Sequence, residues 1–214
     1  MNIVIIGQGG HSKVIEDVIF ANSDDHIVGY LDDKYEDVTS INQAYYGPIS
    51  FAHEMINSFN EIKFVIGIGN NQIRKKIVKQ LNFPEQFYAT LVHPSAVISP
   101  RARIGYGTVI MAGAIINTDA RIGHHTIINT SSVVEHDNWI GDFVHISPNA
   151  TLTGTDYVEE GVHVGAGATV LPNITIGEWA VIGGGATVIK HIPPNCTAVG
   201  VPAKIIAKER AEFV

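Results

Sequence analysis

A branched aliphatic residue occupies every sixth position in the second half of the chain. From Val92 to Val188 these positions hold only Val, Ile or Leu, in seventeen consecutive repeats. The residue four positions later is usually small, with Asn138 and Asp156 among the exceptions. A period of six does not fit an α-helix, whereas short β-branched strands separated by turns do fit it. Since three hexapeptides would form one triangular coil, the repeats predict between five and six stacked coils of an all-β parallel β-helix.

Glycine directly follows the aliphatic residue in several repeats, as at Gly123 and Gly165. Because glycine adopts backbone conformations that other residues avoid, we expect these glycines to provide the tight geometry of the corners. The segment should then consist of strands and corners throughout. The alternative interpretation is a β-sandwich with chance periodicity.

The first ninety positions follow a different pattern, in which apolar runs alternate with helix-spaced apolar residues. Runs at 3–6, 27–31 and 63–68 predict three strands. We expect Ser50 to cap the second helix and Ile73 to face the core from the third. Alternating strands and helices predict a small, Rossmann-like parallel sheet. The chain therefore divides into an α/β domain at 1–90 and a β-helix domain at 91–214.

The predicted strand ends of the α/β domain carry glycine and polar residues, where parallel sheets bind ligands. These residues are Gly9, Gly10 and His11 after the first strand, Asp32 and Asp33 after the second, and Gly69 after the third. A nicotinamide dinucleotide would explain the glycines, but Ser12 replaces the third glycine of that fingerprint. Another interpretation is that the glycines only form a tight turn.

Composition and charge favour small-molecule partners. Hydrophobic residues make up 45% of the 214 positions and charged residues 16%, which allows a sizeable core. A net charge of −7 argues against binding to nucleic acid or anionic membranes. The single cysteine, Cys196, cannot form an internal disulfide, and no apolar run is long enough for a membrane helix or signal peptide. We therefore expect a cytoplasmic protein without membrane insertion.

Six segments carry a resemblance to a known family over nearly the whole chain. They are 7–11 (GQGGH), 31–33 (LDD), 69–76 (GNNQIRKK), 129–137 (NTSSVVEHD), 183–187 (GGGAT) and 200–204 (GVPAK). The repeat resembles the hexapeptide acyltransferase superfamily, and the segments resemble its sialic-acid O-acetyltransferase and UDP-4-amino-sugar N-acetyltransferase family. This resemblance implies a left-handed β-helix and a homotrimer that binds acyl-CoA between neighbouring subunits.

The resemblance also implies where the sugar substrate binds. In the N-acetyltransferases of this group the first domain holds the UDP-sugar, which points to the same strand-end residues, Gly9 to His11, Asp32, Asp33 and Gly69. The paired aspartates could accept hydrogen bonds from a uracil N–H or a ribose hydroxyl. Asn129 could orient the acceptor, although an internal asparagine stack is equally consistent with the pattern.

Acetyl transfer needs a base, and His136 is the best candidate. A carboxylate on Asp137 that accepts the other ring N–H would fix the tautomer and make the imidazole more basic. Neighbouring residues on a strand point to opposite faces, so this pairing requires a bend, which a corner could supply. The family places its catalytic histidine here and generally follows it with glutamate, so Asp137 is one methylene shorter.

The resemblance assigns the acyl-CoA site to residues further along the repeat. His145 lies nine residues after His136, half a coil, and is implied to lie near the acyl-CoA and the acceptor amine. Ala166 and Gly184 are implied to lie beside the pantetheine arm. The alternatives are a structural histidine and simple repeat geometry. No base accompanies Cys196 in the sequence, so an acyl-cysteine intermediate is not expected.

The sequence thus predicts transfer of acetyl from acetyl-CoA to the amino group of a UDP-linked amino sugar for surface glycan biosynthesis, with no metal. O-acetylation of a sugar hydroxyl is the first alternative. Two others are a metal-dependent lyase similar to γ-class carbonic anhydrases, and a non-catalytic binding module.

Overall fold

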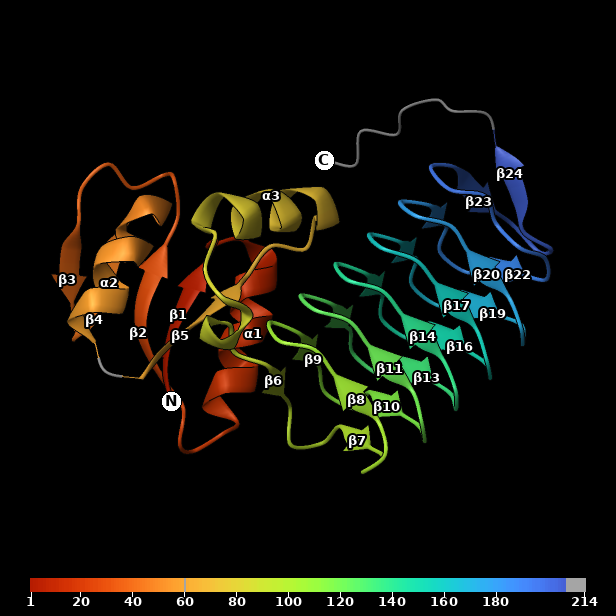
Figure 1. Ribbon diagram of the computed structural model, residues 1–214, viewed down its shortest axis with the longest axis horizontal. Helices are drawn as coiled ribbons and strands as arrows, with labels where there is room; N and C mark the ends of the chain where they lie inside the picture. Colours follow the sequence, from red (N-terminus) through yellow and green to blue (C-terminus); the bar gives the residue numbers. More distant parts are fainter. Residues whose placement is uncertain (60, 207–214) are drawn as a thin grey trace.

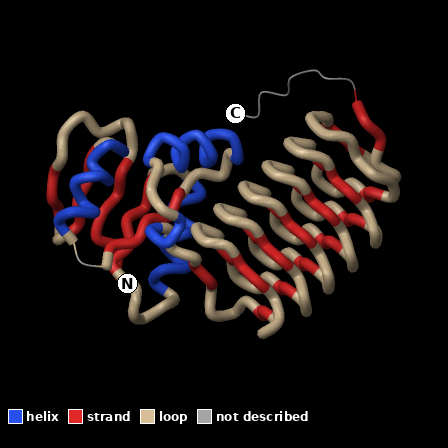
Figure 2. Tube along the Cα trace, viewed as in Figure 1, coloured by secondary structure: helices blue, strands red, loops and turns tan. Residues whose placement is uncertain are grey.

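The computed structural model describes residues 1–59 and 61–206. The first part of the chain forms a five-stranded sheet flanked by helices (Figures 1 and 2). Its strands are β1 (Asn2–Ile6), β2 (His26–Leu31), β3 (Thr39–Ile41), β4 (Ala44–Gly47) and β5 (Ile62–Ile66). Its helices are α1 (Gly10–Phe20), α2 (Ala52–Ser58) and α3 (Asn71–Leu81), with short 3₁₀ turns at Ile49–Phe51 and Glu85–Phe87.

The sheet is mixed, with strand order β3-β4-β2-β1-β5. Strands β4, β2, β1 and β5 are parallel, as predicted for the core of the sheet, whereas β3 is antiparallel to β4. The β3–β4 hairpin was not predicted, because all three residues of β3 are exposed and show no apolar alternation. Its turn places Asn42 and Gln43 at positive φ.

Alternate residues of β1 enter two different cores, as the pleat of a strand requires. Ile3 and Ile5 pack with α1, and Val4 and Ile6 pack with α2 and α3 on the other face. The α1 core also contains Leu91 and Val109 of the β-helix, and α1 lies between the sheet and the β-helix in Figure 1. The first domain and the β-helix therefore share one core, and the division at residue 90 remains a prediction.

Two finer helix predictions are wrong. Ser50 lies in the 3₁₀ turn, and α2 begins after Phe51 without a side-chain cap. Ile73 is 48% exposed, and the buried position beside it belongs to Arg74. At this position the helix therefore buries the cationic side chain of Arg74 instead of the aliphatic side chain of Ile73.

The repeat forms three parallel sheets of a left-handed β-helix, named here by their first strand. The β6 sheet contains β6 (Leu91–Val92), β9 (Val109–Ile110), β12 (Ile127–Ile128), β15 (His145–Ile146), β18 (His163–Val164), β21 (Val181–Ile182), β23 (Thr197–Val199) and the antiparallel β24 (Lys204–Ile206). The β7 sheet contains β7 (Val97–Ile98), β10 (Ile115–Ile116), β13 (Val133–Val134), β16 (Thr151–Leu152), β19 (Thr169–Val170) and β22 (Thr187–Val188). The β8 sheet contains β8 (Arg103–Ile104), β11 (Arg121–Ile122), β14 (Trp139–Ile140), β17 (Tyr157–Val158) and β20 (Thr175–Ile176).

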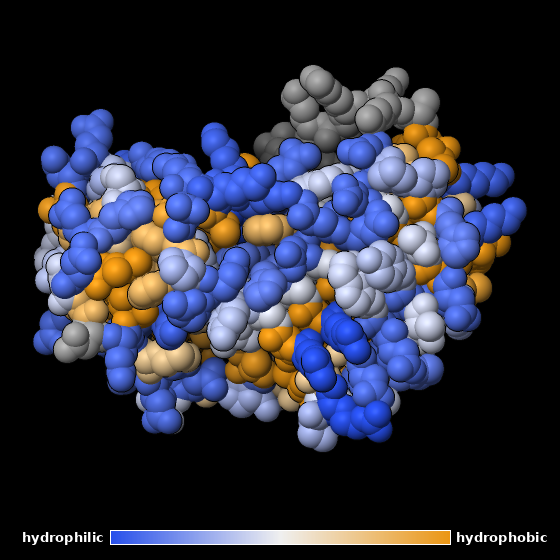
Figure 3. Space-filling view, in the orientation of Figure 1, coloured by the Kyte–Doolittle hydropathy of each residue, from blue (hydrophilic) through white to orange (hydrophobic). Residues whose placement is uncertain are grey.

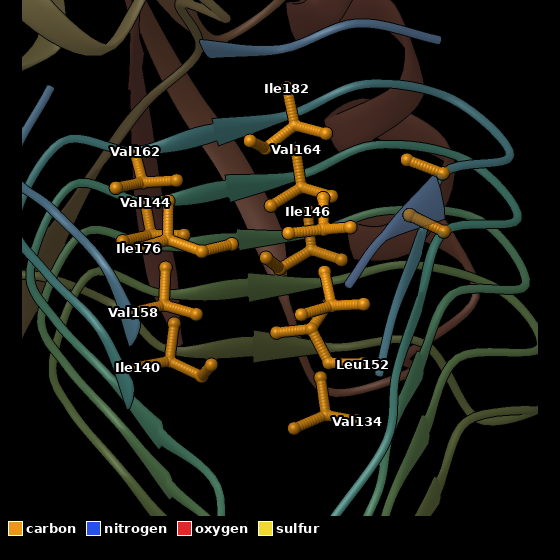
Figure 4. Packing of buried hydrophobic residues seen from close by; sticks show 14 of the residues in the cluster. Val134, Ile140, Val144, Ile146, Leu152, Val158, Val162, Val164, Ile176 and Ile182 are labelled. Carbon is orange, nitrogen blue, oxygen red and sulfur yellow. The ribbon is translucent and has the colours of Figure 1, made fainter. Parts of the chain in front are cut away.

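The predicted repeat is confirmed position by position. Each aliphatic residue is the second residue of one of the strands β6 to β22, and it pairs with its equivalents in the neighbouring coils, as Ile128 does with Ile110 and Ile146. Figure 4 shows the resulting stacks inside the coil, including Ile140, Val158 and Ile176. Burial of this continuous stack supplies the hydrophobic core of the β-helix.

The expected role of the glycines is wrong. The left-handed residue of a corner lies three positions after the aliphatic residue, as at Asp137 and Phe143. Gly123 and Gly165, which directly follow aliphatic residues, do not have positive φ. A Cβ at Gly123 would lie 2.6 Å from the carbonyl carbon of Gly141. These glycines therefore permit the close approach of adjacent coils rather than an unusual conformation.

The outward side chains differ between two of the sheets. On the β7 sheet they are Val97, Ile115 and Val133, followed by Thr151, Thr169 and Thr187, and Val97 is 63% exposed. On the β8 sheet they begin with Arg103 and Arg121, and Figure 3 shows strongly hydrophilic surface over β8 and β11. The outward strand residues of the β7 sheet include no charged side chain, so this face is better suited to burial against another surface.

Among the described residues, no helix is both long enough and apolar enough to cross a membrane.

Candidate active site

His136 and Asp137 form a side-chain pair at the corner between β13 and β14. Asp137 has a φ of 59°, a left-handed conformation that aspartate adopts more readily than most residues. This bend turns both side chains to the same side, and His136 Nδ1 lies 2.8 Å from Asp137 Oδ2. Both side chains are 55% exposed. The bend expected from the sequence is therefore present.

The pairing determines which ring nitrogen of His136 can act as a base. A carboxylate can only accept, so Nδ1 carries the hydrogen and donates it to Asp137. The Nε2 lone pair is then available to take a proton. The ring lies against Gly154 of the next coil, where a Cβ would come within 2.6 Å of Cε1. Glycine at that position therefore leaves space for the imidazole.

A second group of polar side chains lies where the first domain meets the β6 sheet. It consists of His11, Asn129, His145, Ser147 and His163, and is called here the junction cluster. His145 Nε2 lies 3.0 Å from the amide nitrogen of Asn129, and His163 Nε2 lies 3.0 Å from the Ser147 hydroxyl. The rings of His145 and His163 are 4.8 Å apart, and those of His11 and His145 are 6.3 Å apart.

Burial keeps the three histidines of the junction cluster neutral. It lowers the pKa of His11 to about 4, with a further contribution from the charge of Arg74. It also lowers the pKa of His145 well below its usual value, and the charges of His163, Arg74 and His11 lower it further. A hydrogen bond to the Gly69 backbone acts in the opposite direction. The same two causes, burial and Arg74, lower the pKa of His163. Near neutral pH these rings serve as hydrogen-bonding groups rather than charges.

Arg74 fixes the position of the first domain against the β-helix. Its side chain donates to the carbonyl oxygens of His125 at 2.8 Å and Phe143 at 2.9 Å, which occupy the same corner in successive coils. Asn71 donates to the carbonyl of Gly161, one coil further along. Arg74 also binds the carbonyl of Gly69 at 3.2 Å, which places this strand end beside His145.

Sequence reasoning missed the functions of Arg74, Asn71 and His163. Arg74 and Asn71 lie within the segment 69–76 that carries the family resemblance, but nothing in the local pattern predicts a buried guanidinium. His163 lies one coil, or eighteen residues, after His145, so the repeat itself could have identified it as a neighbour.

The predicted strand-end residues lie at one edge of the first sheet. Gly9 and Gly10 lie at the start of α1, and a Cβ at either one would meet no atom within 4 Å. Asp32 accepts hydrogen bonds from the backbone N–H of Gln8 at 2.7 Å and of Lys34 at 3.0 Å. Asp33 is exposed. Asp32 therefore shapes the backbone of this edge, and Asp33 faces solvent.

Ala166 and Gly184 lie in the corners that follow β18 and β21, one above the other. Both are exposed, and the Ala166 carbonyl accepts a hydrogen bond from the N–H of Gly185 at 2.8 Å. A Cβ at Gly185 would meet no atom within 4 Å. This corner therefore presents an open strip of backbone that a linear ligand could approach.

The described part of the chain brings some candidate residues together and leaves others apart. His11, Gly69, Asn129 and His145 meet at the junction, whereas the His136 pair lies on a different corner. Within residues 1–59 and 61–206, no hydrogen bond or ring contact links that pair to the junction cluster. Two surface pockets, one beside Met1 and one beside Arg101, are lined by none of these residues.

A histidine-bound metal would require several ligands in one place. The described residues contain no group of three or more His, Cys, Asp or Glu side chains that could hold a metal ion.

Residues 2–81 match the PglD N-terminal domain, and residues 157–190 match the bacterial transferase hexapeptide of six repeats. A UDP-N-acetylbacillosamine N-acetyltransferase of Bacillus subtilis is 49% identical over 106 residues, which cover 50% of this chain and 49% of that protein. The match thus spans about half the length of this curated relative.

Solved structures match the chain over nearly its full length. PerB from Caulobacter crescentus, in complex with CoA and GDP-perosamine, is 34% identical with a TM-score of 0.86, and the match covers 97% of this chain and 98% of PerB. The acetyltransferase domain of PglB from Neisseria gonorrhoeae, in complex with acetyl coenzyme A, is 31% identical with a TM-score of 0.80, covering 96% and 98%. The chain therefore belongs to the PglD-like family of hexapeptide-repeat acetyltransferases.

Proposed function

We propose that this protein transfers an acetyl group from acetyl-CoA to the amino group of a UDP-linked amino sugar, for the synthesis of a surface glycan. The observation that carries this proposal is the His136 and Asp137 pair, which leaves Nε2 of the imidazole as an accessible base. The complexes of PerB with CoA and GDP-perosamine and of the PglB domain with acetyl-CoA support the two substrate classes. The name of the Bacillus subtilis relative supports UDP as the nucleotide.

In the proposed reaction the sugar amine attacks the thioester carbonyl while His136 Nε2 removes a proton from the attacking nitrogen. The new C–N bond forms, a backbone N–H stabilises the oxyanion, and the C–S bond then breaks. The departing CoA sulfur takes the proton from the imidazolium. The carboxylate of Asp137 stabilises that imidazolium and holds the ring in one tautomer.

The other candidate residues receive binding roles in this proposal. Gly9 to His11, Asp32, Asp33 and Gly69 hold the nucleotide sugar at the edge of the first sheet, and Asn129 orients the acceptor. Neutral His145 lies near the acyl group, with a ring that hydrogen-bonds without adding charge. Ala166 and Gly184 adjoin the pantetheine arm along the open corner.

We further propose that the protein is a homotrimer and acts in the cytoplasm without a bound metal. The trimer would bring the His136 corner of one subunit to the junction cluster of another. The uncharged outer face of the β7 sheet supports such an assembly, because it includes the exposed Val97 and its burial would desolvate no charged strand residue.

The direct test is to incubate the protein with acetyl-CoA and a panel of UDP-, GDP- and dTDP-linked amino sugars and to measure free thiol release. We expect release only with an amino sugar, and fastest with a UDP-linked one. The product separates the two acetylation chemistries, because an amide resists hydroxylamine and an ester does not. An ester product, or release with a sugar that lacks an amine, would contradict the proposal.

A further inference from the structure

The corners that follow the strands of the β7 sheet, one of which carries His136, are closed by different hydrogen bonds in different coils. In its first two coils the corner is closed by a backbone bond, from the N–H of Ala102 to Ser99 at 3.0 Å and from Ala120 to Asn117 at 3.4 Å. In the following coils, side-chain oxygens accept the backbone N–H groups of these corners. The N–H of Asp156 donates to Asn138 Oδ1 at 3.0 Å, and the N–H of Ile174 donates to Asp156 Oδ1 at 2.8 Å.

Asn138 ties the His136 corner to the coil that follows it. Its amide nitrogen donates to the carbonyl oxygens of Glu135 and Thr153, both at 2.7 Å. Glu135 immediately precedes His136, and Asn138 immediately follows Asp137. The buried side chain of Asn138 therefore holds both ends of the segment that carries His136 and Asp137. It also holds the end of β16, which leads to Gly154 beneath the imidazole.

Stability alone does not account for Asp156, the second member of this pair of buried polar residues. Asn138 and Asp156 are each 1% exposed, at the inward position that alanine occupies in several other coils. The core cluster of the β-helix consists of apolar side chains, including Ile140, Val158 and Ile176 (Figure 4). Asp156 Oδ2 is buried with no hydrogen-bond partner among the described residues. A buried carboxyl with one unsatisfied oxygen destabilises the fold relative to alanine. Its benefit must therefore lie in geometry rather than in packing.

We propose that Asn138 and Asp156 form an interior ladder that positions the His136 and Asp137 pair. The 2.8 Å contact of the pair requires a left-handed residue between two fixed ends, and the ladder fixes those ends in place of the usual backbone bond. Asn138 is the positioning residue, and Asp156 holds the next coil in register below it. The catalytic consequence rests on the proposed function, whereas the geometric one does not.

The test compares Asn138→Ala with Thr108→Ala. Thr108 is the matched control because its buried side chain likewise donates to a carbonyl, that of Gly123 at 2.8 Å, and accepts the N–H of Thr126 at 3.1 Å, but on a different corner. Both variants lose an interior link between coils, so both should lower the melting temperature. Only Asn138→Ala should loosen the His136 corner.

The first readout is the NMR titration of the His136 ring in the protein without substrates. We expect its midpoint and its tautomer signature to change in Asn138→Ala and to remain those of the wild type in Thr108→Ala. Asp156→Asn, which keeps the oxygen that accepts from Ile174, should also preserve them. An unchanged His136 titration in Asn138→Ala, or an equal change in Thr108→Ala, would overturn the inference.

The second readout is steady-state kinetics. Misplacement of a catalytic group by about 1 Å can reduce turnover on the order of 100-fold, so Asn138→Ala should lower kcat by roughly 10- to 100-fold with KM for both substrates within about threefold. Thr108→Ala should keep kcat within about twofold. If the His136 titration changes while kcat does not, the ladder positions the pair as inferred, and it is the assignment of His136 as the base that fails.

Discussion

At the scale of single residues, the contact between His136 and Asp137 depends on a backbone conformation that few residue types adopt easily. Asp137 is left-handed, with φ of 59°, and aspartate is enriched in that region. The family that the sequence resembles generally has the longer glutamate at this position. The shorter side chain still reaches His136 Nδ1 at 2.8 Å, because the bend at the corner brings the two side chains together.

Replacement of His136 tests the proposed chemistry directly. General base catalysis contributes about 10²- to 10⁴-fold, so His136→Ala should reduce kcat by that order while substrate affinities stay within a few-fold. Asp137→Ala should reduce kcat less, because the base remains and only its orientation and stabilisation are lost. Thiol release measures both. Near-wild-type turnover in His136→Ala would exclude it as the base.

The aspartates after β2 offer a separable test of sugar binding. Asp33→Ala should weaken the affinity for the UDP-sugar and leave that for acetyl-CoA unchanged, as measured by calorimetry. Asp33 is the cleaner site, since Asp32 also binds two backbone N–H groups and its replacement would disturb the local fold. Equal affinities in Asp33→Ala and the wild type would move the nucleotide elsewhere.

Asp156 should make the stability of the protein depend on pH. Burial raises the pKa of Asp156 from 3.8 to about 7, so between these values the folded protein binds a proton that the unfolded chain releases. The contribution of Asp156 to the free energy of unfolding is therefore greatest below about pH 4, falls as the pH rises to about 7 and is constant above pH 7. The whole change is at most about 4 kcal/mol. Melting temperatures of the wild type and Asp156→Asn at pH 5 and pH 8 should show the variant losing less stability over this interval. Parallel curves would contradict the assignment.

At the scale of elements, α3 is attached to the β-helix by polar contacts rather than by an apolar face. Arg74 and Asn71 donate to carbonyls at 125, 143 and 161, an eighteen-residue spacing that only a stack of coils provides. The helix thus recognises the repeat of the β-helix backbone. This contact also sets the position of the Gly69 strand end.

Removal of the guanidinium should release α3 and disturb the junction cluster. Hydrogen bonds to a charged group are worth about 1.5–3 kcal/mol, so Arg74→Met should destabilise the protein by several kcal/mol. Amide hydrogen exchange should increase most in residues 71–81. Lys76→Met, an exposed change on the same helix, is the control and should leave both quantities near the wild type. Unchanged exchange in Arg74→Met would show that other contacts hold the helix.

At the scale of the whole molecule, the candidate residues occupy separate columns of one β-helix. The His136 corner follows a strand of the β7 sheet, whereas the junction cluster and the Ala166 corner both lie along the β6 sheet, and this separation suits a site completed by a second subunit. The uncharged outer face of the β7 sheet offers a surface for that assembly. Within the described part of a single chain, no hydrogen bond or ring contact links the proposed base His136 to the junction cluster.

Light scattering at micromolar concentration should therefore give the mass of a trimer. Mixing two inactive variants, His136→Ala and His145→Ala, under conditions that exchange subunits should restore part of the activity, because some sites would then receive one intact residue from each partner. A monomeric mass, or no recovery after confirmed exchange, would contradict a shared site.

Features that depend on residues close together in the sequence could be predicted, whereas features that depend on contacts between distant residues could not. The aliphatic period, the stacked coils and the strands β1, β2 and β5 depend on side chains a few residues apart, so the sequence alone determined them. The β3 strand of the β3–β4 hairpin was not predicted because all three of its residues are exposed. The role of the corner glycines was not predicted because the atoms that a Cβ would meet at these positions belong to the next coil.

The position of the base, His136, was proposed from the sequence and a family resemblance, but its 2.8 Å contact with Asp137 was decided by the left-handed corner. The buried Arg74, the neutral junction histidines and the Asn138 ladder arise between residues that are 15 or more positions apart in the chain. Periodicity determines which residues face inward. Only the stacking of one coil on another, and of the first domain on the coils, determines which polar groups meet, because those distances depend on the whole fold rather than on any local pattern.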